Sequence, residues 1–247
     1  LLVTIIPPSL LFWGSGLLKE GILLFALGLF LNGVSILWTK NNCIKACIII
    51  IISIAIFSIS KFYVLMALIP GTISLWLSKH YKRSTVIFTS IHIILYLSIF
   101  ILPHINGLPD IPQIIAQKQN DFIRYVHSLN EVGSFIESPF LKPDFFTFTF
   151  QAFRGAAITL FRPHIFEVYN AATIPAAIEN TLTIILLLMV IMTKHQKTPL
   201  KTILFCISFT FILFALAGMT TPVLGALVRY KIPAQPFLYA ALLVHID

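Results

Sequence analysis

The chain has 247 residues, of which 58% are hydrophobic and only 11% are charged. A soluble domain carries about 25% charged residues, so this composition excludes an ordinary soluble globule. The abundance of apolar residues also excludes a disordered chain. Because apolar stretches of about 20 residues recur along the whole length, the sequence predicts an all-α, polytopic transmembrane helical bundle.

Apolar runs between charged residues predict seven or eight membrane spans. Five are expected within residues 1–102 and three within residues 174–247. The chain begins with Leu1 rather than Met and lacks the basic region of a signal peptide, so we expect further residues before it. The expected spans are Leu1–Leu18, Gly21–Trp38, Ala46–Ser60, Phe62–Leu77, Val86–Leu102, Ile174–Met192, Leu200–Gly218 and Ile232–Ile246.

Basic residues alternate between the two ends of these spans. The second, fourth and sixth connections hold eight basic residues and no acidic one: Lys40, Lys45, Lys79, Lys82, Arg83, Lys194, Lys197 and Lys201. By the positive-inside rule this end faces the cytoplasm, and the long segment 103–173 faces the outside. The net charge of +8 therefore reflects topology, and we expect no nucleic-acid partner.

The long segment 103–173 contains six of the nine acidic residues and two predicted helices. An apolar stripe at helical spacing predicts an amphipathic helix near residues 113–137. The residues of this stripe are Ile115, Phe122, Val126, Leu129 and Ile136. The phenylalanine-rich stretch near residues 145–161 is too polar for a comfortable span, so we expect an interfacial or re-entrant helix there.

Two carboxylates are candidates for a catalytic role. Glu179 directly precedes an unbroken apolar run, and an ionisable residue at that depth is a functional candidate. A carboxylate near the start of a helix also has a structural explanation in the helix dipole. Glu167 is the second candidate, because it lies close to cations in the long segment.

Four further residues are candidates for binding a substrate: Arg162, His164, Arg229 and Lys231. Cations near the outer membrane surface can hold an anionic lipid headgroup or a pyrophosphate. The alternative is that they are topology anchors. We expect Arg229 and Lys231 to pair with Glu179 or Glu167, which would bring these residues together in one site.

No pattern for a metal site or a phosphate loop occurs in the sequence, so we expect no metal and no cofactor. The three cysteines indicate no disulfide framework. One polar residue inside a span, His92, is expected to form a hydrogen bond to a neighbouring helix.

The segment Arg229–Phe237, which reads RYKIPAQPF, resembles the R-Y-x-x-P-x-x-P-F stretch near the end of polytopic, GT-C-like glycosyltransferases that use lipid-linked sugars. FRPHIFE at residues 161–167 and AAIEN at residues 176–180 are similar to bacterial envelope membrane proteins of that kind. Those enzymes carry catalytic acidic residues in an early external loop. The single acidic residue in the first hundred positions here is Glu20, so no catalytic residue is carried over.

This resemblance implies a protein of the bacterial inner membrane that takes part in envelope glycan assembly. Its reaction would be the transfer or polymerisation of polyprenyl-phosphate-linked sugars at the outer membrane face. A transporter or flippase for a lipid or solute is an alternative, and so is a non-catalytic membrane subunit. Membrane lipids are expected partners in each case, a polyprenyl-phosphate-linked glycan in the first, and the sequence specifies no protein partner.

Overall fold

The computed structural model describes residues 8–10, 19–39, 42–81, 83–105, 107–129, 134–168, 173–193 and 200–246. Within these ranges the regular elements are helices, and one isolated bridge joins Phe135 to Val223. The predicted all-α class is therefore confirmed.

The described helices fall into two groups by their place in the chain. The first group is α3 (Lys19–Thr39), α4 (Cys43–Ser60), α5 (Phe62–Ser78), α6 (Ser84–Ile101), α7 (Ile111–Ser128) and α8 (Phe145–Phe161). The second group is α9 (Ile174–Met192), α10 (Leu200–Thr220), α11 (Leu224–Lys231) and α12 (Gln235–Ile246). Short 3-10 turns occupy Leu102–His104, Ile165–Glu167 and Ile232–Ala234.

Five of these helices are long and apolar enough to cross a membrane, which indicates an integral membrane protein. They are α3, α4, α6 with its following 3-10 turn, α9 and α10. Helix α5 is also apolar but has 17 residues. The expected first span, Leu1–Leu18, falls almost entirely outside the described residues, so the larger count of seven or eight stays a prediction.

The last expected span, Ile232–Ile246, is helical in the structure. Its first three residues form a 3-10 turn that contains Pro233, and the remainder is the 12-residue helix α12. A 12-residue helix rises about 18 Å, whereas the hydrocarbon core of a bilayer is about 30 Å thick. This span therefore stays a prediction.

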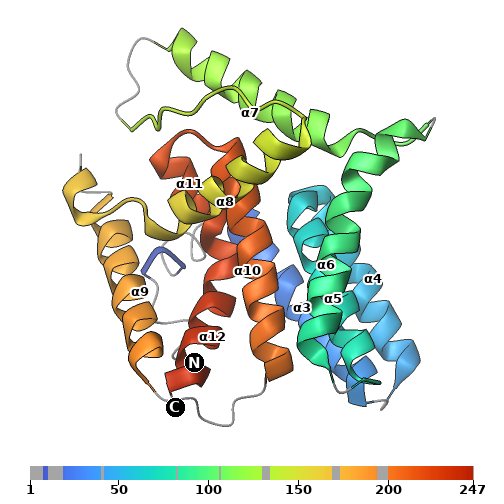
Figure 1. Ribbon diagram of the computed structural model, residues 1–247. Helices are drawn as coiled ribbons and strands as arrows, with labels where there is room; N and C mark the ends of the chain where they lie inside the picture. Colours follow the sequence, from blue (N-terminus) through green and yellow to red (C-terminus); the bar gives the residue numbers. More distant parts are fainter. Residues whose placement is uncertain are drawn as a thin grey trace.

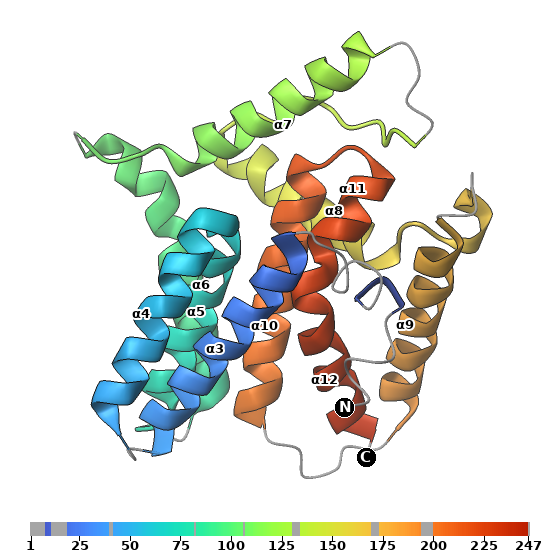
Figure 2. The same ribbon diagram turned by 180° about the vertical axis from the view of Figure 1, so that it is seen from behind.

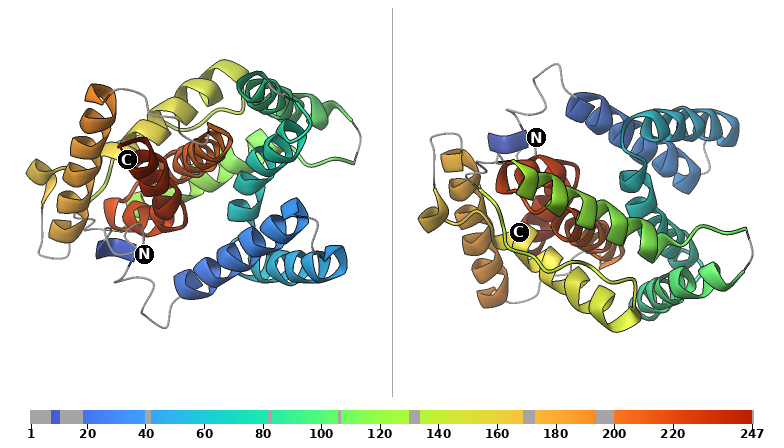
Figure 3. Two further views of the ribbon diagram at one scale, coloured as in Figure 1. Left: turned by 90° about the horizontal axis from the view of Figure 1, so that it is seen from below. Right: turned by 90° about the horizontal axis from the view of Figure 1, so that it is seen from above.

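Helices α3 to α6 pack together on one side of the molecule, and α9, α10 and α12 stand on the other (Figures 1 and 2). Helix α7 lies across one end of both of these sides, as the view from above also shows (Figure 3). Phe57, Leu68, Phe209 and Leu213 are completely buried in one hydrophobic core cluster. His92 on α6 joins α10 through a hydrogen bond of 2.5 Å between Nε2 and the Ser208 hydroxyl, as predicted.

The structure groups the described loop cations as the charge alternation predicts. Lys45 lies in the first turn of α4, Lys79 follows α5, Arg83 precedes α6 and Lys201 begins α10. These helix ends are all opposite α7 (Figure 1). The bundle therefore separates the lysine-rich connections from the long segment, and the assignment of the outer side stays a prediction.

Helix α7 is shorter than the predicted helix near residues 113–137. It ends at Ser128, and Ile136 belongs to an extended stretch beyond it. The Ile136 amide donates to the Pro222 carbonyl at 2.7 Å, and the Ile136 side chain is buried with Leu224 and Leu227. Pairing with a distant loop therefore takes this residue out of the helical stripe. Helix α8 has the predicted bounds.

Helices α8 and α10 cross in close backbone contact at Gly155 and Gly218. A Cβ atom added to Gly155 would lie 2.8 Å from the Met219 backbone nitrogen, and one added to Gly218 would overlap the Gly155 backbone. Small residues let helix backbones approach in this way in membrane proteins. The crossing positions α8 beneath α7, next to the end of the bundle that carries the buried charges.

We expect Gly218→Ala to lower the free energy of unfolding by about 1–3 kcal/mol, because the new methyl group must displace the α8 backbone. Gly28→Ala on α3 is the matched control, since an added Cβ there meets nothing within 4 Å. The control should be stabilising by about 0.5–1 kcal/mol, the usual gain from Gly to Ala within a helix. Denaturation in detergent micelles measures both values, and equal effects would contradict the close crossing.

Candidate functional site

A buried carboxylate, Glu20, holds two cations from distant parts of the chain. Glu20 lies in the first turn of α3 and is fully buried. Arg229 on α11 donates from Nε to Oε1 at 2.6 Å and from Nη2 to Oε2 at 3.0 Å. Lys61, between α4 and α5, donates to Oε1 at 2.9 Å. The carboxylate thus joins three helical elements through charge-assisted hydrogen bonds.

Two tyrosines and a third cation surround these groups. Lys61 Nζ lies 4.6 Å from the centre of the Tyr230 ring, and Lys118 Nζ on α7 lies 5.3 Å from that of Tyr63. The two rings meet edge to face, with 6.3 Å between their centres. The buried Tyr63 hydroxyl has no hydrogen-bond partner among the described residues. We call Glu20, Lys61, Tyr63, Lys118, Arg229 and Tyr230 the Glu20 cluster.

The Glu20 cluster is positively charged, because it contains one carboxylate and three cations, of which Lys61 and Arg229 contact the carboxylate. Burial lowers the pKa of Lys61, although the hydrogen bond to Glu20 acts in the opposite direction. The hydrogen bond to Glu20 raises the pKa of Arg229. Lys118 is exposed and has no carboxylate within 4.0 Å among the described residues, so its charge is available to a ligand.

A second group of buried polar residues surrounds Glu179 near the start of α9. Gln235 donates from Nε2 to Glu179 Oε1, and Lys231 Nζ lies 3.6 Å from the same oxygen. The Ser9 amide donates to Oε2 at 3.1 Å. Lys231 also donates to Asn180 Oδ1 at 2.5 Å. These residues form the Glu179 cluster, which joins α9 to α11 and α12.

The Glu179 cluster leaves almost no free space. The cavity beside it has a volume of about 10 Å³, roughly what one water molecule needs. One buried oxygen at this cavity, Gln235 Oε1, has no partner among the described residues. The arrangement therefore resembles a structural lock between helices more than an open binding site.

The third group lies between α8 and α9. Arg162 forms an ion pair with Glu167, and His164 Nε2 lies 3.5 Å from the same carboxylate oxygen. The His164 amide donates to the other oxygen at 3.2 Å. Burial raises the pKa of Glu167, but the hydrogen bonds from Arg162 and the His164 amide outweigh it, so the pKa is lowered overall. Asn180 connects this Arg162 cluster to the Glu179 cluster by donating to the Pro163 carbonyl at 2.8 Å.

The predicted site residues therefore lie in three clusters instead of one site. Lys231 pairs with Glu179, as expected, but Arg229 pairs with Glu20 and with neither Glu179 nor Glu167. The reason is that Arg229 and Lys231 lie two residues apart on α11 and so project in different directions. Both candidate catalytic carboxylates already accept hydrogen bonds from the protein, and their catalytic role stays a prediction.

Glu20, Lys61 and Lys118 were not predicted from the sequence as members of a candidate site. One signal was present: Glu20 is the single acidic residue in the first hundred positions and directly precedes an apolar run. Such residues in membrane proteins are functional candidates, the same argument that selected Glu179. Nothing in the local sequence around Lys61 or Lys118 indicates that the two lysines belong to the same cluster.

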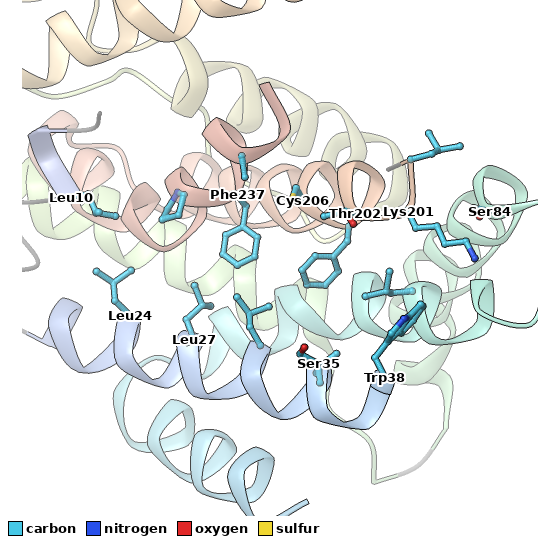
Figure 4. Close-up of a pocket in the computed structure, with 18 residues that line it drawn as sticks. Leu10, Leu24, Leu27, Ser35, Trp38, Ser84, Lys201, Thr202, Cys206 and Phe237 are labelled. Atoms are coloured by element: carbon cyan, nitrogen blue, oxygen red, sulfur yellow. The ribbon is translucent and has the colours of Figure 1, made fainter. Parts of the chain in front are cut away.

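A large apolar groove runs along α3 from a point close to the Glu20 cluster. Its volume is about 1060 Å³, and α3 faces α10 and α12 across it (Figure 4). The α3 residues that line it form one helical stripe: Leu24, Leu27, Gly28, Leu31, Val34, Ser35 and Trp38. Glu20 lies four residues before Leu24 and therefore on the same face of the helix, one turn beyond the groove. We call this feature the α3 groove.

The fold and these clusters define the chain as an all-helical integral membrane protein with buried charges at one end of its bundle. No protein-family model matches it, and no similar curated protein or solved structure was found. Among the described residues, no group of three or more histidine, cysteine, aspartate or glutamate side chains could hold a metal ion.

We expect Arg229→Gln to lower the free energy of unfolding by about 3 kcal/mol, the lower end of what breaking a buried ion pair costs. The lower end applies because Lys61 still contacts Glu20. The double variant Glu20→Gln/Arg229→Gln should lose less than the sum of the two single variants. Unfolding in detergent measures the coupling, and strict additivity would contradict the Glu20–Arg229 pair.

The lowered pKa of Glu167 makes stability depend on pH on the acid side. In the unfolded chain the carboxylate titrates near its ordinary pKa of 4.5. Its stabilising contribution is complete above that value and is lost as the pH falls through the lower pKa of the folded state. From about pH 6 to about pH 3, the melting temperature of the wild type should therefore fall more steeply than that of Glu167→Gln. Arg162→Gln should also make the melting temperature less dependent on pH. If the melting temperatures of the wild type and the variants fall in parallel with pH, the ion pair between Arg162 and Glu167 is contradicted.

Proposed function

We propose that this integral membrane protein binds a lipid-linked sugar with an anionic phosphate and acts in envelope glycan assembly. In this proposal the phosphate occupies the Glu20 cluster and the polyprenyl chain lies in the α3 groove. The observation that carries the proposal is the position of a positively charged cluster one helical turn beyond an apolar groove. The reaction class is that of a membrane glycosyltransferase or glycan polymerase.

Selectivity for such a ligand has to come from its headgroup. Bilayer hydrocarbon is as apolar as the lining of the groove, so there is little hydrophobic gain when a lipid chain leaves the bilayer. A phosphate that meets Lys118 gains a charge-assisted hydrogen bond instead. The Tyr63 hydroxyl, which has no hydrogen-bond partner among the described residues, adds a polar group at the same place.

The segment that resembles GT-C-like glycosyltransferases contributes to the proposed phosphate site. Arg229 begins the RYKIPAQPF segment and belongs to the Glu20 cluster. By the positive-inside rule, the lysine-rich helix ends face the cytoplasm, and α7 with the Glu20 cluster faces the outside. Sugar transfer would then occur at the outer face of a bacterial inner membrane, beneath α7.

A second candidate function, transport of a lipid or solute, is favoured by the buried pair of Glu179 and Lys231. Ion pairs within membrane proteins often mark ion or proton pathways. The adjoining cavity of about 10 Å³ holds no solute, so transport would require the helices around it to separate. Uptake by proteoliposomes that Lys231→Gln abolishes, without any glycan product, would favour this function over the first.

Lys118→Gln tests the proposed function without disturbing the buried ion pair. We expect it to weaken the binding of a long-chain polyprenyl phosphate about fivefold, the effect of one lysine near a membrane surface. Lys142→Gln removes an exposed lysine from the same long segment and should leave binding unchanged. Native mass spectrometry of the protein in detergent, with added polyprenyl phosphate, measures the bound fraction.

Gly28→Phe tests the groove in the same assay. The added ring has open space to enter and should block the chain, because Gly28 lines the groove and has nothing within 4 Å of an added Cβ. Incorporation of labelled sugar from a polyprenyl-linked donor should fall in both Gly28→Phe and Lys118→Gln. If both variants bind and transfer like the wild type, the proposed function is wrong.

A further inference from the structure

The end of the α3 groove farthest from the Glu20 cluster has a different chemical character. Figure 4 shows Leu10 and Leu24 toward one end and Trp38, Lys201 and Ser84 toward the other. Ser35 and Thr202 also line this second end. Hydroxyl groups, an indole and an ammonium group thus gather where the groove leaves the apolar part of the bundle.

Among the described residues, Lys201 uses one of its three donors. Its Nζ donates a hydrogen bond of 2.6 Å to the Ser78 carbonyl. An ammonium group has three donors, so within the described part of the chain two can serve a ligand. Lys201 lies in the first turn of α10, and Ser84 is the first residue of α6. The N-termini of these two helices add positive potential at this end of the groove, because the helix dipole is positive there.

A second lysine increases the positive charge at this end. Lys79 Nζ donates to the Trp38 carbonyl at 2.7 Å and lies 5.1 Å from the centre of the Trp38 ring. In the described part of the chain, no carboxylate comes within 4.0 Å of Lys79 or Lys201. This distinguishes the lysine pair from Lys61 and Arg229, which share Glu20.

We propose that this end of the α3 groove binds the phosphate of an anionic phospholipid from the adjacent leaflet. The headgroup meets Lys201 and the hydroxyls of Ser84 and Thr202, and one acyl chain lies along the α3 stripe. Lysines with no carboxylate nearby among the described residues attract the negatively charged phosphate of a phospholipid. Trp38 is typical of the membrane interface, which sets the headgroup at this depth.

The inference goes beyond the proposed function, because it concerns another ligand at the opposite end of the groove. A groove of about 1060 Å³ is near the upper end of ordinary ligand sites. A phospholipid chain that enters from the Lys201 end therefore occupies the space that a polyprenyl chain needs. The two lipids compete, although their headgroups bind at opposite membrane surfaces.

Lys201→Gln tests this lipid site against a matched control. The protein is purified in detergent and mixed with phosphatidylglycerol or phosphatidylcholine of identical acyl chains, and native mass spectrometry measures the bound lipid. We expect the wild type to prefer phosphatidylglycerol and Lys201→Gln to lose about fivefold to tenfold in its binding. Lys45→Gln removes an exposed lysine from the same end of the bundle, outside the α3 groove, and should keep the preference.

Two further variants make the result independent of folding defects. Lys201→Arg keeps the charge and should keep the preference for phosphatidylglycerol. Gly28→Phe fills the groove and should lose both phospholipids. An unchanged preference in Lys201→Gln, or an equal loss in Lys45→Gln, would overturn the proposed lipid site.

The same assay separates this inference from the proposed function. Lys118→Gln should weaken polyprenyl phosphate binding and leave the phosphatidylglycerol preference unchanged. Lys201→Gln should weaken the preference for phosphatidylglycerol and leave the binding of the polyprenyl phosphate headgroup unchanged. With both lipids present in wild-type protein, a rise in one bound species should lower the other, and simultaneous binding of both would overturn the competition.

Discussion

The burial of the Glu20 carboxylate is the constraint on which the charged end of this bundle depends. A carboxylate removed from water requires nearby cations and hydrogen-bond donors, because its desolvation is otherwise very unfavourable. Glu20 obtains them from Lys61 and Arg229, so the start of α3, the junction of α4 and α5, and helix α11 must meet at one point. The Tyr63 and Tyr230 rings and the Lys118 side chain of α7 then gather around this point.

The fold was largely predictable where local signals decide it. Helix α8 has the bounds expected from its phenylalanine-rich stretch, and Asp144 caps its first turn by accepting a hydrogen bond from the Thr147 amide. Helix α7 ends earlier than its apolar stripe suggested, because Ile136 pairs with the loop at Pro222. A contact between segments this far apart leaves no trace in the periodicity of either one.

Only part of the candidate site was predictable from the sequence. Arg229 was predicted as a candidate binding residue, whereas Glu20 and Lys61 were not, and the Glu20 partner of Arg229 lies 209 positions away. Lys61 and Glu20 are separated by 41 positions. Charge and depth in a span indicate that a residue needs a partner, and they do not indicate which one. The choice of partner depends on how the helices pack, with the 3-10 turn Ile232–Ala234 after α11 in contact with α3, and a single sequence does not show that arrangement.

The α3 groove also determines where a ligand comes from. Its lining includes Gly28 and Ser35, which are exposed on a helix long and apolar enough to span a membrane. In the two proposed modes of lipid binding, a lipid would approach sideways through the bilayer and would never have to dissolve in water. Occupancy would then follow the mole fraction of each lipid in the membrane, and an abundant phospholipid would set the concentration at which a scarce polyprenyl lipid begins to compete. Under these two proposals, the lipid composition of the host membrane would be a control on this protein.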